Sequence, residues 1–201
     1  MRGPVDRLTH RLPRPVQLAI DWIVTIVGAV AIVLAIKAWV VNPYRIPTSS
    51  MEPTLLCAGG GLGCTARLSD RVLANRFIYH LVDPKRGDIV VFETPLDARR
   101  QCAAGGTFVK RIIGLPGETV EVRNGSVMVN GARLRESYLQ TDRRDRGRTI
   151  PRYRIPKNHY YVMGDNRAQS CDSTVWGALP RANLIGKVFA VYWPPKRISL
   201  R

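Results

Sequence analysis

Three short stretches of the sequence carry hydroxyl, amine and carboxylate groups in settings where they could do chemistry. IPTSSMEPTL at 46–55 places two serines between prolines, just after a long apolar run. FVKRIIGLPGE at 108–118 has a lysine, Lys110, inside an apolar strand pattern. MGDNRAQSCDS at 163–173 is a polar turn rich in carboxylates and hydroxyls. Together they offer what acyl transfer requires: a nucleophile, a base and groups that orient both.

The serine stretch by itself permits three structural interpretations. Ser49 and Glu52 have the Ser-x-x-Glu spacing of a capping box, which would begin a helix. A linker between an apolar segment and a folded domain would have the same prolines. A catalytic serine is the third interpretation, and it requires a base.

The choice of base falls on a lysine. Histidine is the usual partner of a serine, but His10, His80 and His159 lie in contexts typical of surface or strand histidines. An ordinary lysine has a pKa near ~10.4 and is protonated, but burial among apolar groups lowers this value by several units. Lys110 is surrounded by apolar residues at 108–115. The alternative is an edge-strand lysine that faces solvent.

A long apolar segment precedes the serines. Residues 18–41 read LAIDWIVTIVGAVAIVLAIKAWVV, and Trp22 to Ile36 contains no charged residue. About 20 such residues span the hydrocarbon core of a bilayer. A buried helix would be apolar on one face only, and a cleavable signal peptide would be shorter and end in small residues. Residues 16–41 are therefore predicted to form a transmembrane anchor, with Lys37 reaching the interface.

The residues before this anchor determine its predicted orientation. Positions 1–15 contain four arginines against one acidic residue. Positively charged flanks stay in the cytoplasm. We therefore expect a cytoplasmic segment at 1–15 and an extracytoplasmic domain at 42–201, in a single-pass protein of the plasma membrane.

The chain is strongly basic, with a formal net charge of +16 over 201 residues. This balance suggests an anionic partner such as lipid headgroups or nucleic acid. A position beside an anionic leaflet weakens the nucleic-acid interpretation and favours the lipid bilayer. A solubilising basic surface is the other alternative.

Four cysteines, Cys57, Cys64, Cys102 and Cys171, agree with an exported domain. An even number predicts disulfides, with three possible pairings. Cys57 and Cys64 flank a short loop and are easily joined, which would leave Cys102 with Cys171. No Cys-x-x-Cys spacing supports a metal site, so no metal is expected. Free buried thiols are the remaining alternative.

Short β-branched and aromatic runs recur after residue 42, separated by Gly, Pro, Asn and Asp, and predict strands. Asn124-Gly125 and Asn130-Gly131 have the composition of hairpin turns. The predicted fold is mostly β: an antiparallel sheet domain with the strand spacing of a sandwich or barrel. The charged, turn-rich residues 117–157 are predicted to form a small inserted β subdomain with a solvated face, and the sequence assigns no role to the basic segment 143–154.

The motifs resemble those of the bacterial type I signal peptidases (leader peptidases). These are membrane-anchored Ser/Lys proteases of family S26 that remove signal peptides. IPTSSMEPTL resembles the nucleophile motif, and RGDIVVF at 86–92 the strand motif that follows it. FVKRIIGLPGE resembles the lysine motif and MGDNRAQSCDSTVWG the Gly-Asp-Asn motif. No single motif suffices, but four in this order behind an anchor make the match specific, and it covers nearly the whole chain from the anchor onward.

The resemblance implies a role for five residues of these motifs. Ser50 matches the nucleophile, and Lys110 matches its general base. The backbone N–H of Ser50 and the hydroxyl of Thr48 match the two donors of the oxyanion hole. Ser170 matches the serine that hydrogen-bonds the lysine amine. Asp172 matches an acid that steadies the region through an ion pair.

Two positions depart from the family pattern. Ser49 stands where glycine is frequent, so it competes with Ser50 as nucleophile, although the spacing to the following methionine favours Ser50. Thr174 stands where arginine is usual. This leaves Arg111 as the expected ion-pair partner of Asp172.

The resemblance also implies the substrate. A preprotein is expected to add as a strand beside Tyr44–Thr48 and Thr107–Phe108, with small residues, typically alanine, at positions −1 and −3 of the cut. A shallow apolar pocket is predicted to be lined by Tyr44, Ile46, Pro47, Met51, Leu55, Thr107 and Phe108. The expected partners are preproteins that carry signal peptides, the lipid bilayer and, by proximity, the secretion translocon. No cofactor is expected.

Two other functions would use parts of the same pattern. A self-cleaving repressor-type protease also uses a Ser/Lys dyad, but it would be cytosolic and linked to a DNA-binding helical module, against which the anchor argues. A membrane-tethered basic β domain could bind lipid or nucleic acid without catalysis. That domain would not need Ser50, Lys110 and Ser170 to converge, whereas the peptidase would.

Overall fold

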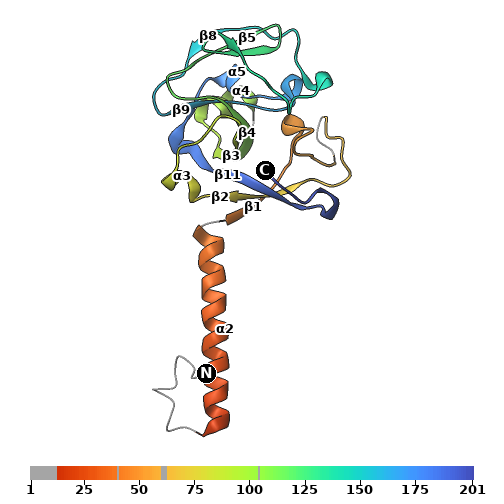
Figure 1. Ribbon diagram of the computed structural model, residues 1–201. Coiled ribbons are helices and arrows are strands. Elements are labelled where there is room, and N and C mark those ends of the chain that lie inside the picture. Colours follow the sequence, from red (N-terminus) through yellow and green to blue (C-terminus); the bar gives the residue numbers. More distant parts are fainter. Residues whose placement is uncertain (1–12, 40, 60–62, 104) are drawn as a thin grey trace. The chain divides into compact units, whose positions relative to one another are not determined.

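The computed structural model describes residues 13–39, 41–59, 63–103 and 105–201 (Figure 1). The chain divides into two units, Met1–Val41 and Asn42–Arg201. Helix α2, Arg14–Trp39, makes up the described part of the first unit. Positions 1–12, on which the predicted orientation depends, and the side chain of Lys37 lie outside the described part of the chain.

Helix α2 is long and apolar enough to cross a membrane. It has 26 residues, which at 1.5 Å each give a length of about 39 Å. The hydrocarbon core of a bilayer is about 30 Å thick. Residues Arg14–Leu34 have a mean hydropathy of 2.2, and none of the most apolar stretch is buried inside the structure. Apolar side chains exposed all round the helix fit a lipid environment.

The second unit is built on two sheets, and the strand pairs whose register is defined are antiparallel. The larger sheet has the order β1-β2-β11-β3-β4-β9-β10, with β12 paired to β11, and the smaller has the order β7-β6-β5-β8. The strands of the larger sheet are β1 Val41–Arg45, β2 Arg71–Asn75, β3 Ile89–Glu93, β4 Thr107–Gly114, β9 His159–Met163, β10 Leu179–Pro180, β11 Leu184–Trp193 and β12 Ser199–Leu200. The predicted mostly-β, antiparallel fold class is confirmed.

The helices among the described residues of this unit are short. Three are α-helical: α3 Ile78–Leu81, α4 Leu96–Cys102 and α5 Ser173–Trp176. Five are 3-10 turns: Ser49–Met51, Thr141–Arg143, Arg167–Gln169, Arg181–Asn183 and Pro195–Arg197.

The smaller sheet interrupts the larger one between β4 and β9, inside the range 117–157. Its strands are β5 Thr119–Arg123, β6 Ser126–Val129, β7 Ala132–Arg133 and β8 Ile150–Arg154. Asn124 and Gly125 join β5 to β6 with positive φ angles of 46° and 74°, as a type I′ hairpin requires. In Figure 1, β5 and β8 lie at the end of the unit opposite β1 and β2.

Strand β3 lies at the centre of the larger sheet and is covered on both faces. Successive side chains of a strand point to opposite faces. Ile89 and Val91 pack in one apolar cluster, and Val90 and Phe92 pack in another on the other face. A strand covered on both faces is expected to be a continuous apolar run, and IVVF is such a run. This doubly covered strand pairs directly with β4, which carries Lys110.

Candidate active site

The alternation of β4 sends Lys110 and Arg111 to opposite faces of the sheet. Lys110 pairs in register with Val90 and Arg111 with Ile89, which belong to the two different apolar clusters. Lys110 is only 4% exposed, and its amine lies 5.3 Å from the centre of the Phe108 ring. The strand pattern left a buried and a solvent-facing lysine open; the buried one is present, and the solvent-facing alternative is wrong.

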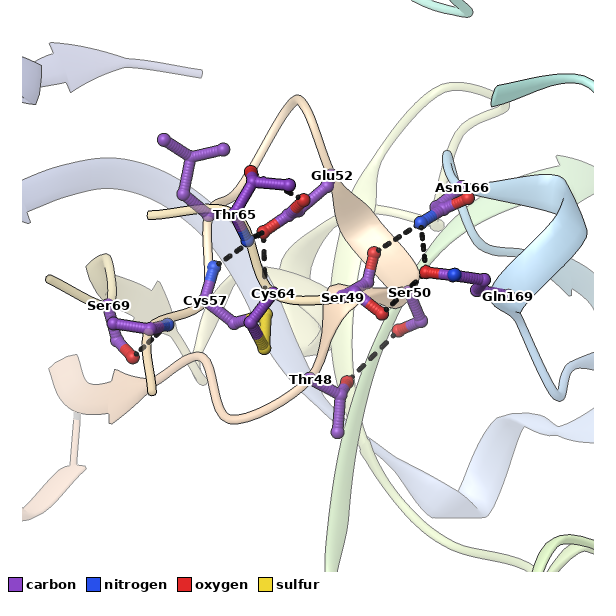
Figure 2. The surroundings of a disulfide bond; sticks show 12 residues. Thr48, Ser49, Ser50, Glu52, Cys57, Cys64, Thr65, Ser69, Asn166 and Gln169 are labelled. Atoms are coloured by element: carbon purple, nitrogen blue, oxygen red, sulfur yellow. Dashed lines mark hydrogen bonds between the residues drawn. A yellow bond between two sulfur atoms is a disulfide. The ribbon is translucent and has the colours of Figure 1, made fainter. Parts of the chain in front are cut away.

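The amine of Lys110 meets one serine of the opening motif. Its Nζ lies 2.6 Å from the Oγ of Ser50, with which it is hydrogen-bonded. Thr48 is extended, and its Oγ1 lies 3.3 Å from the same Oγ (Figure 2). The fold thus brings Thr48, Ser50 and Lys110 together, although 60 positions separate the serine from the lysine.

Ser49 makes different contacts from Ser50. Its hydroxyl donates to the Oε1 of Gln169 at 3.2 Å (Figure 2). Asn166 fixes the backbone of both serines, because its side-chain amide donates to the Ser49 carbonyl at 3.1 Å and its N–H donates to the Ser50 carbonyl at 3.0 Å. The Lys110 amine is hydrogen-bonded to the Ser50 hydroxyl, so the geometry favours Ser50 as the nucleophile.

The capping-box interpretation of this stretch is wrong. The 3-10 helix has three residues and no side-chain cap. Glu52 is buried instead, and its carboxylate accepts hydrogen bonds from the N–H of Cys57, the N–H of Thr65 and the Thr65 hydroxyl (Figure 2). Arg143, in the 3-10 turn between β7 and β8, lies 3.6 Å from the same carboxylate. Glu52 therefore fastens the loop beside the nucleophile.

Burial governs the protonation of Lys110. Desolvation lowers its pKa from 10.5 to about 8, while the negative charges of Asp172 and Asp165 act in the opposite direction and limit the fall. Taking an ammonium out of water disfavours its charged form. A substantial fraction of Lys110 is consequently neutral near pH 8 and can accept a proton.

The prediction of an ion pair between Arg111 and Asp172 is wrong. Arg111 instead binds Asp165 with two hydrogen bonds, Nε to Oδ1 at 2.9 Å and Nη2 to Oδ2 at 2.6 Å. Asp172 is the N-cap of α5, where its carboxylate accepts from the N–H of Thr174 and also from the N–H of Gly164. A carboxylate committed to a helix cap and a neighbouring backbone donor is satisfied without a cation.

Thr174, which stands where the family usually has arginine, connects Asp172 to a more distant cation. Its hydroxyl donates to Asp172 at 2.7 Å and accepts from Arg148 at 2.7 Å. Arg148 belongs to the segment between β7 and β8. This segment therefore contacts the first turn of α5.

The predicted hydrogen bond between Ser170 and the Lys110 amine is not formed. The Oγ of Ser170 is buried and has no hydrogen-bond partner within the described residues. Ser170 lies instead against Gly164, where an added Cβ would fall 2.3 Å from that Oγ and 2.4 Å from the Ser50 carbonyl oxygen. A glycine is required at position 164 for the two serines to approach it.

A cleft of 370 Å³ opens beside Ser50 and Lys110. It is lined by Tyr44, Arg45, Ile46, Pro47, Thr48, Ser50, Met51, Cys102, Gly105, Thr107, Phe108, Val109, Lys110, Gln169 and Cys171. All predicted pocket residues except Leu55 line it. Leu55 is fully buried in an apolar cluster, because its N–H bonds back to the carbonyl of Met51 and turns the chain inward.

Two disulfides flank the site, Cys57–Cys64 and Cys102–Cys171, the pairing favoured from the sequence. The first closes the loop that Glu52 holds. The second joins α4 to the residue after Ser170, and both of its cysteines line the cleft.

Three further residues of the site had no role assigned from sequence: Asp165, Asn166 and Gln169. The feature of the sequence that pointed to these residues was their position in the polar turn at 163–173. Composition could not distinguish Asp165 from Asp172, because only the fold shows which carboxylate faces Arg111 and which caps α5.

A buried lysine amine of lowered pKa in contact with a serine hydroxyl, on an antiparallel β domain, is the arrangement of a serine hydrolase. The sequence matches the family described as signal peptidase, peptidase S26, over residues 19–193. It is 40% identical to the probable signal peptidase I-2 of Synechocystis sp., over 88% of this chain and 74% of that protein. It is 36% identical to a signal peptidase I of Leptolyngbya laminosa, over 93% and 86% of the two chains. It is 35% identical to signal peptidase I P of Bacillus subtilis subsp. natto, over 89% and 91%.

The chain therefore belongs to the signal peptidase I family, peptidase S26, and is an enzyme. The alternative of a basic β domain without catalysis is set aside by this membership.

Proposed function

We propose that this enzyme cleaves signal peptides from preproteins with Ser50 as nucleophile and Lys110 as general base. Signal-peptide removal follows from the family. The assignment of the dyad rests on one observation. The amine of Lys110, which is buried and has a lowered pKa, lies 2.6 Å from the hydroxyl of Ser50.

The reaction begins with proton transfer. Neutral Lys110 takes the Ser50 proton as Oγ attacks the scissile carbonyl carbon, which becomes tetrahedral. The oxyanion accepts hydrogen bonds from the Ser50 N–H and the Thr48 hydroxyl, and such preorganised donors stabilise the transition state. The ammonium of Lys110 then protonates the leaving amine, the C–N bond breaks, and an acyl-enzyme remains. Water, deprotonated by Lys110, releases the acyl group and restores Ser50.

The substrate enters the cleft as a strand. Residues 107–110 of β4 pair with β3 on one side, but β9 begins to pair with β4 only at Arg111. The other edge of β4 therefore offers backbone donors and acceptors next to Lys110, and an extended peptide can pair with them. The apolar cleft is small, which fits the small residues that the family resemblance implies at positions −1 and −3.

Helix α2 tethers the enzyme to the membrane. Enzymes of this family are membrane-associated, and α2 has the length and hydropathy of a span. With the basic N-terminus in the cytoplasm, the unit Asn42–Arg201 lies outside, where exported preproteins present their cleavage sites. Tethering both partners to one bilayer raises the effective concentration of substrate.

Cleavage of a radiolabelled preprotein by the full chain in detergent micelles tests the dyad. Ser50→Ala and Lys110→Met are expected to lose cleavage, whereas Ser49→Ala keeps it, since the Ser49 hydroxyl donates to Gln169. Cleavage at the wild-type rate by Ser50→Ala would refute Ser50 as the nucleophile. If Ser49→Ala also lost cleavage, the nucleophile would be assigned to Ser49.

A further inference from the structure

Two cavities meet on the inserted subdomain, and none of their lining residues lines the catalytic cleft. Their volumes are 390 Å³ and 300 Å³. Ser126, Arg133 and Arg144 line both, so the two hollows form one groove between the β6–β7 hairpin and the segment that follows it. We call this feature the arginine groove.

Four arginines line the arginine groove: Arg133, Arg135, Arg144 and Arg146. Within the described residues, their side chains form no ion pair and no hydrogen bond. The acidic residues nearby are already engaged with other arginines. These pairs are Glu136–Arg167, Asp142–Arg143 and Asp145–Arg148. The groove therefore gathers four positive charges at solvent-accessible positions, where their combined field attracts an anion.

The wall of the groove is held in place by backbone contacts. The N–H of Gly125, in the β5–β6 turn, donates to the carbonyl of Arg148 at 2.8 Å. The same glycine packs so closely on this segment that an added Cβ would lie 2.4 Å from the carbonyl oxygen of Asp145. The N–H of Leu134 donates to the carbonyl of Val127 at 2.9 Å. The arginines are thus carried on a packed scaffold, which lowers the entropy lost when a ligand binds.

We propose that the arginine groove binds a phosphate-bearing anion. A guanidinium matches a phosphate with two parallel hydrogen bonds, and these charge-assisted bonds are stronger than neutral ones. One carboxylate, that of Glu136, also lines the groove, but it is paired with Arg167. Four arginines in this setting suit a ligand that carries several oxyanions or a phosphate linked to polar groups. The hydroxyl of Ser126, which lines both cavities, offers an additional donor. A phospholipid headgroup and a free phosphate share this chemistry.

Isothermal titration of the full chain in micelles of an uncharged detergent tests the proposal. Inorganic pyrophosphate represents the free anion, and glycerophosphoglycerol represents a lipid headgroup. The test variant is Arg133→Ala/Arg144→Ala, which removes the two arginines shared by both cavities. The control variant is Arg152→Ala/Arg154→Ala, which removes the same charge from exposed positions of β8 outside the groove. Preprotein cleavage, expected to be unchanged in both variants, verifies that they are folded.

The wild type is expected to bind at least one of the two ligands saturably at physiological ionic strength. Its affinity should fall at least tenfold in the groove variant and less than twofold in the control. Binding of glycerophosphoglycerol would identify a lipid headgroup as the source, and binding of pyrophosphate alone would identify a free phosphate. Binding of neither ligand, or an equal loss in both variants, overturns the proposal, since it would mean that the charge acts without a site.

Discussion

Replacing Lys110 by methionine should stabilise the protein near neutral pH while it abolishes catalysis. The cause is the cost of burying an ammonium in the sheet. The fall of the Lys110 pKa from 10.5 to about 8 corresponds to about 3 kcal/mol of unfavourable free energy in the folded, protonated state. Methionine has a similar length and shape and carries no charge, so it removes this cost without opening a cavity.

The sign of the pH dependence follows from proton binding. Below about pH 8 the lysine is protonated in both states, and the folded state bears the full cost. Between about 8 and 10.5 the unfolded chain binds more protons than the folded one, so stability rises with pH. Above 10.5 both states are neutral and the cost is absent. The advantage of Lys110→Met is therefore full at pH 7 and disappears as the pH rises through 10.5.

Urea unfolding of the full chain in detergent micelles, followed by near-ultraviolet circular dichroism, measures this difference. The variant should unfold at a higher free energy, by up to about 3 kcal/mol at pH 7. The lost hydrogen bond to Ser50 offsets this by about 1 kcal/mol at every pH, so the change with pH is the diagnostic quantity. Lys157→Met, at an exposed turn, is the matched control and should show no such dependence. A variant that is less stable than wild type at pH 7 with a flat pH dependence would refute the assignment of Lys110 as a buried, easily neutralised amine.

Three further predictions concern neighbouring residues. In Asp172→Asn, the pH at which cleavage is half-maximal should move below about 8, because the carboxylate that favours the ammonium is gone; a pH–rate profile that does not move contradicts this. Thr48→Val should lower kcat by about 10² to 10³ with little change in KM, as expected for one lost oxyanion donor; an effect confined to KM in steady-state kinetics would argue for substrate binding instead. Arg111→Gln should lower the free energy of unfolding by about 3 to 5 kcal/mol, because it leaves the buried carboxylate of Asp165 uncompensated; urea unfolding at the wild-type midpoint would speak against a structural ion pair.

Local patterns made much of the architecture predictable. The hairpin at Asn124-Gly125 needs residues that tolerate positive φ, and the sequence supplies them. The strand β3 is apolar because both of its faces are covered, and this requirement is visible in the letters IVVF. The apolar setting of Lys110 in β4 made its burial one of two alternatives, and the resemblance of the motifs favoured it.

Partner choice between distant segments could not be predicted. Asp165 and Asp172 are seven positions apart in one turn, and both could have paired with Arg111; the backbone path of the turn decides, by making Asp172 the cap of α5. Glu52 has the spacing of a capping box, but its carboxylate accepts hydrogen bonds from the backbone N–H groups of Cys57 and Thr65 instead. Such outcomes depend on which donors the fold brings near, which a linear pattern does not encode.

The alternation along β4 has a consequence for how this enzyme can fail. Lys110 and Arg111 are adjacent, and the pairing of β4 with β3 decides which of them faces the serine. A slip of one residue would exchange the two faces and present a guanidinium to Ser50. A guanidinium stays protonated at any physiological pH, so it cannot accept the serine proton. A chain with the wrong register is thus inactive, and not partly active or altered in specificity. The measured rate of hydrolysis therefore reports only the fraction of molecules in which β3 and β4 are paired in the correct register.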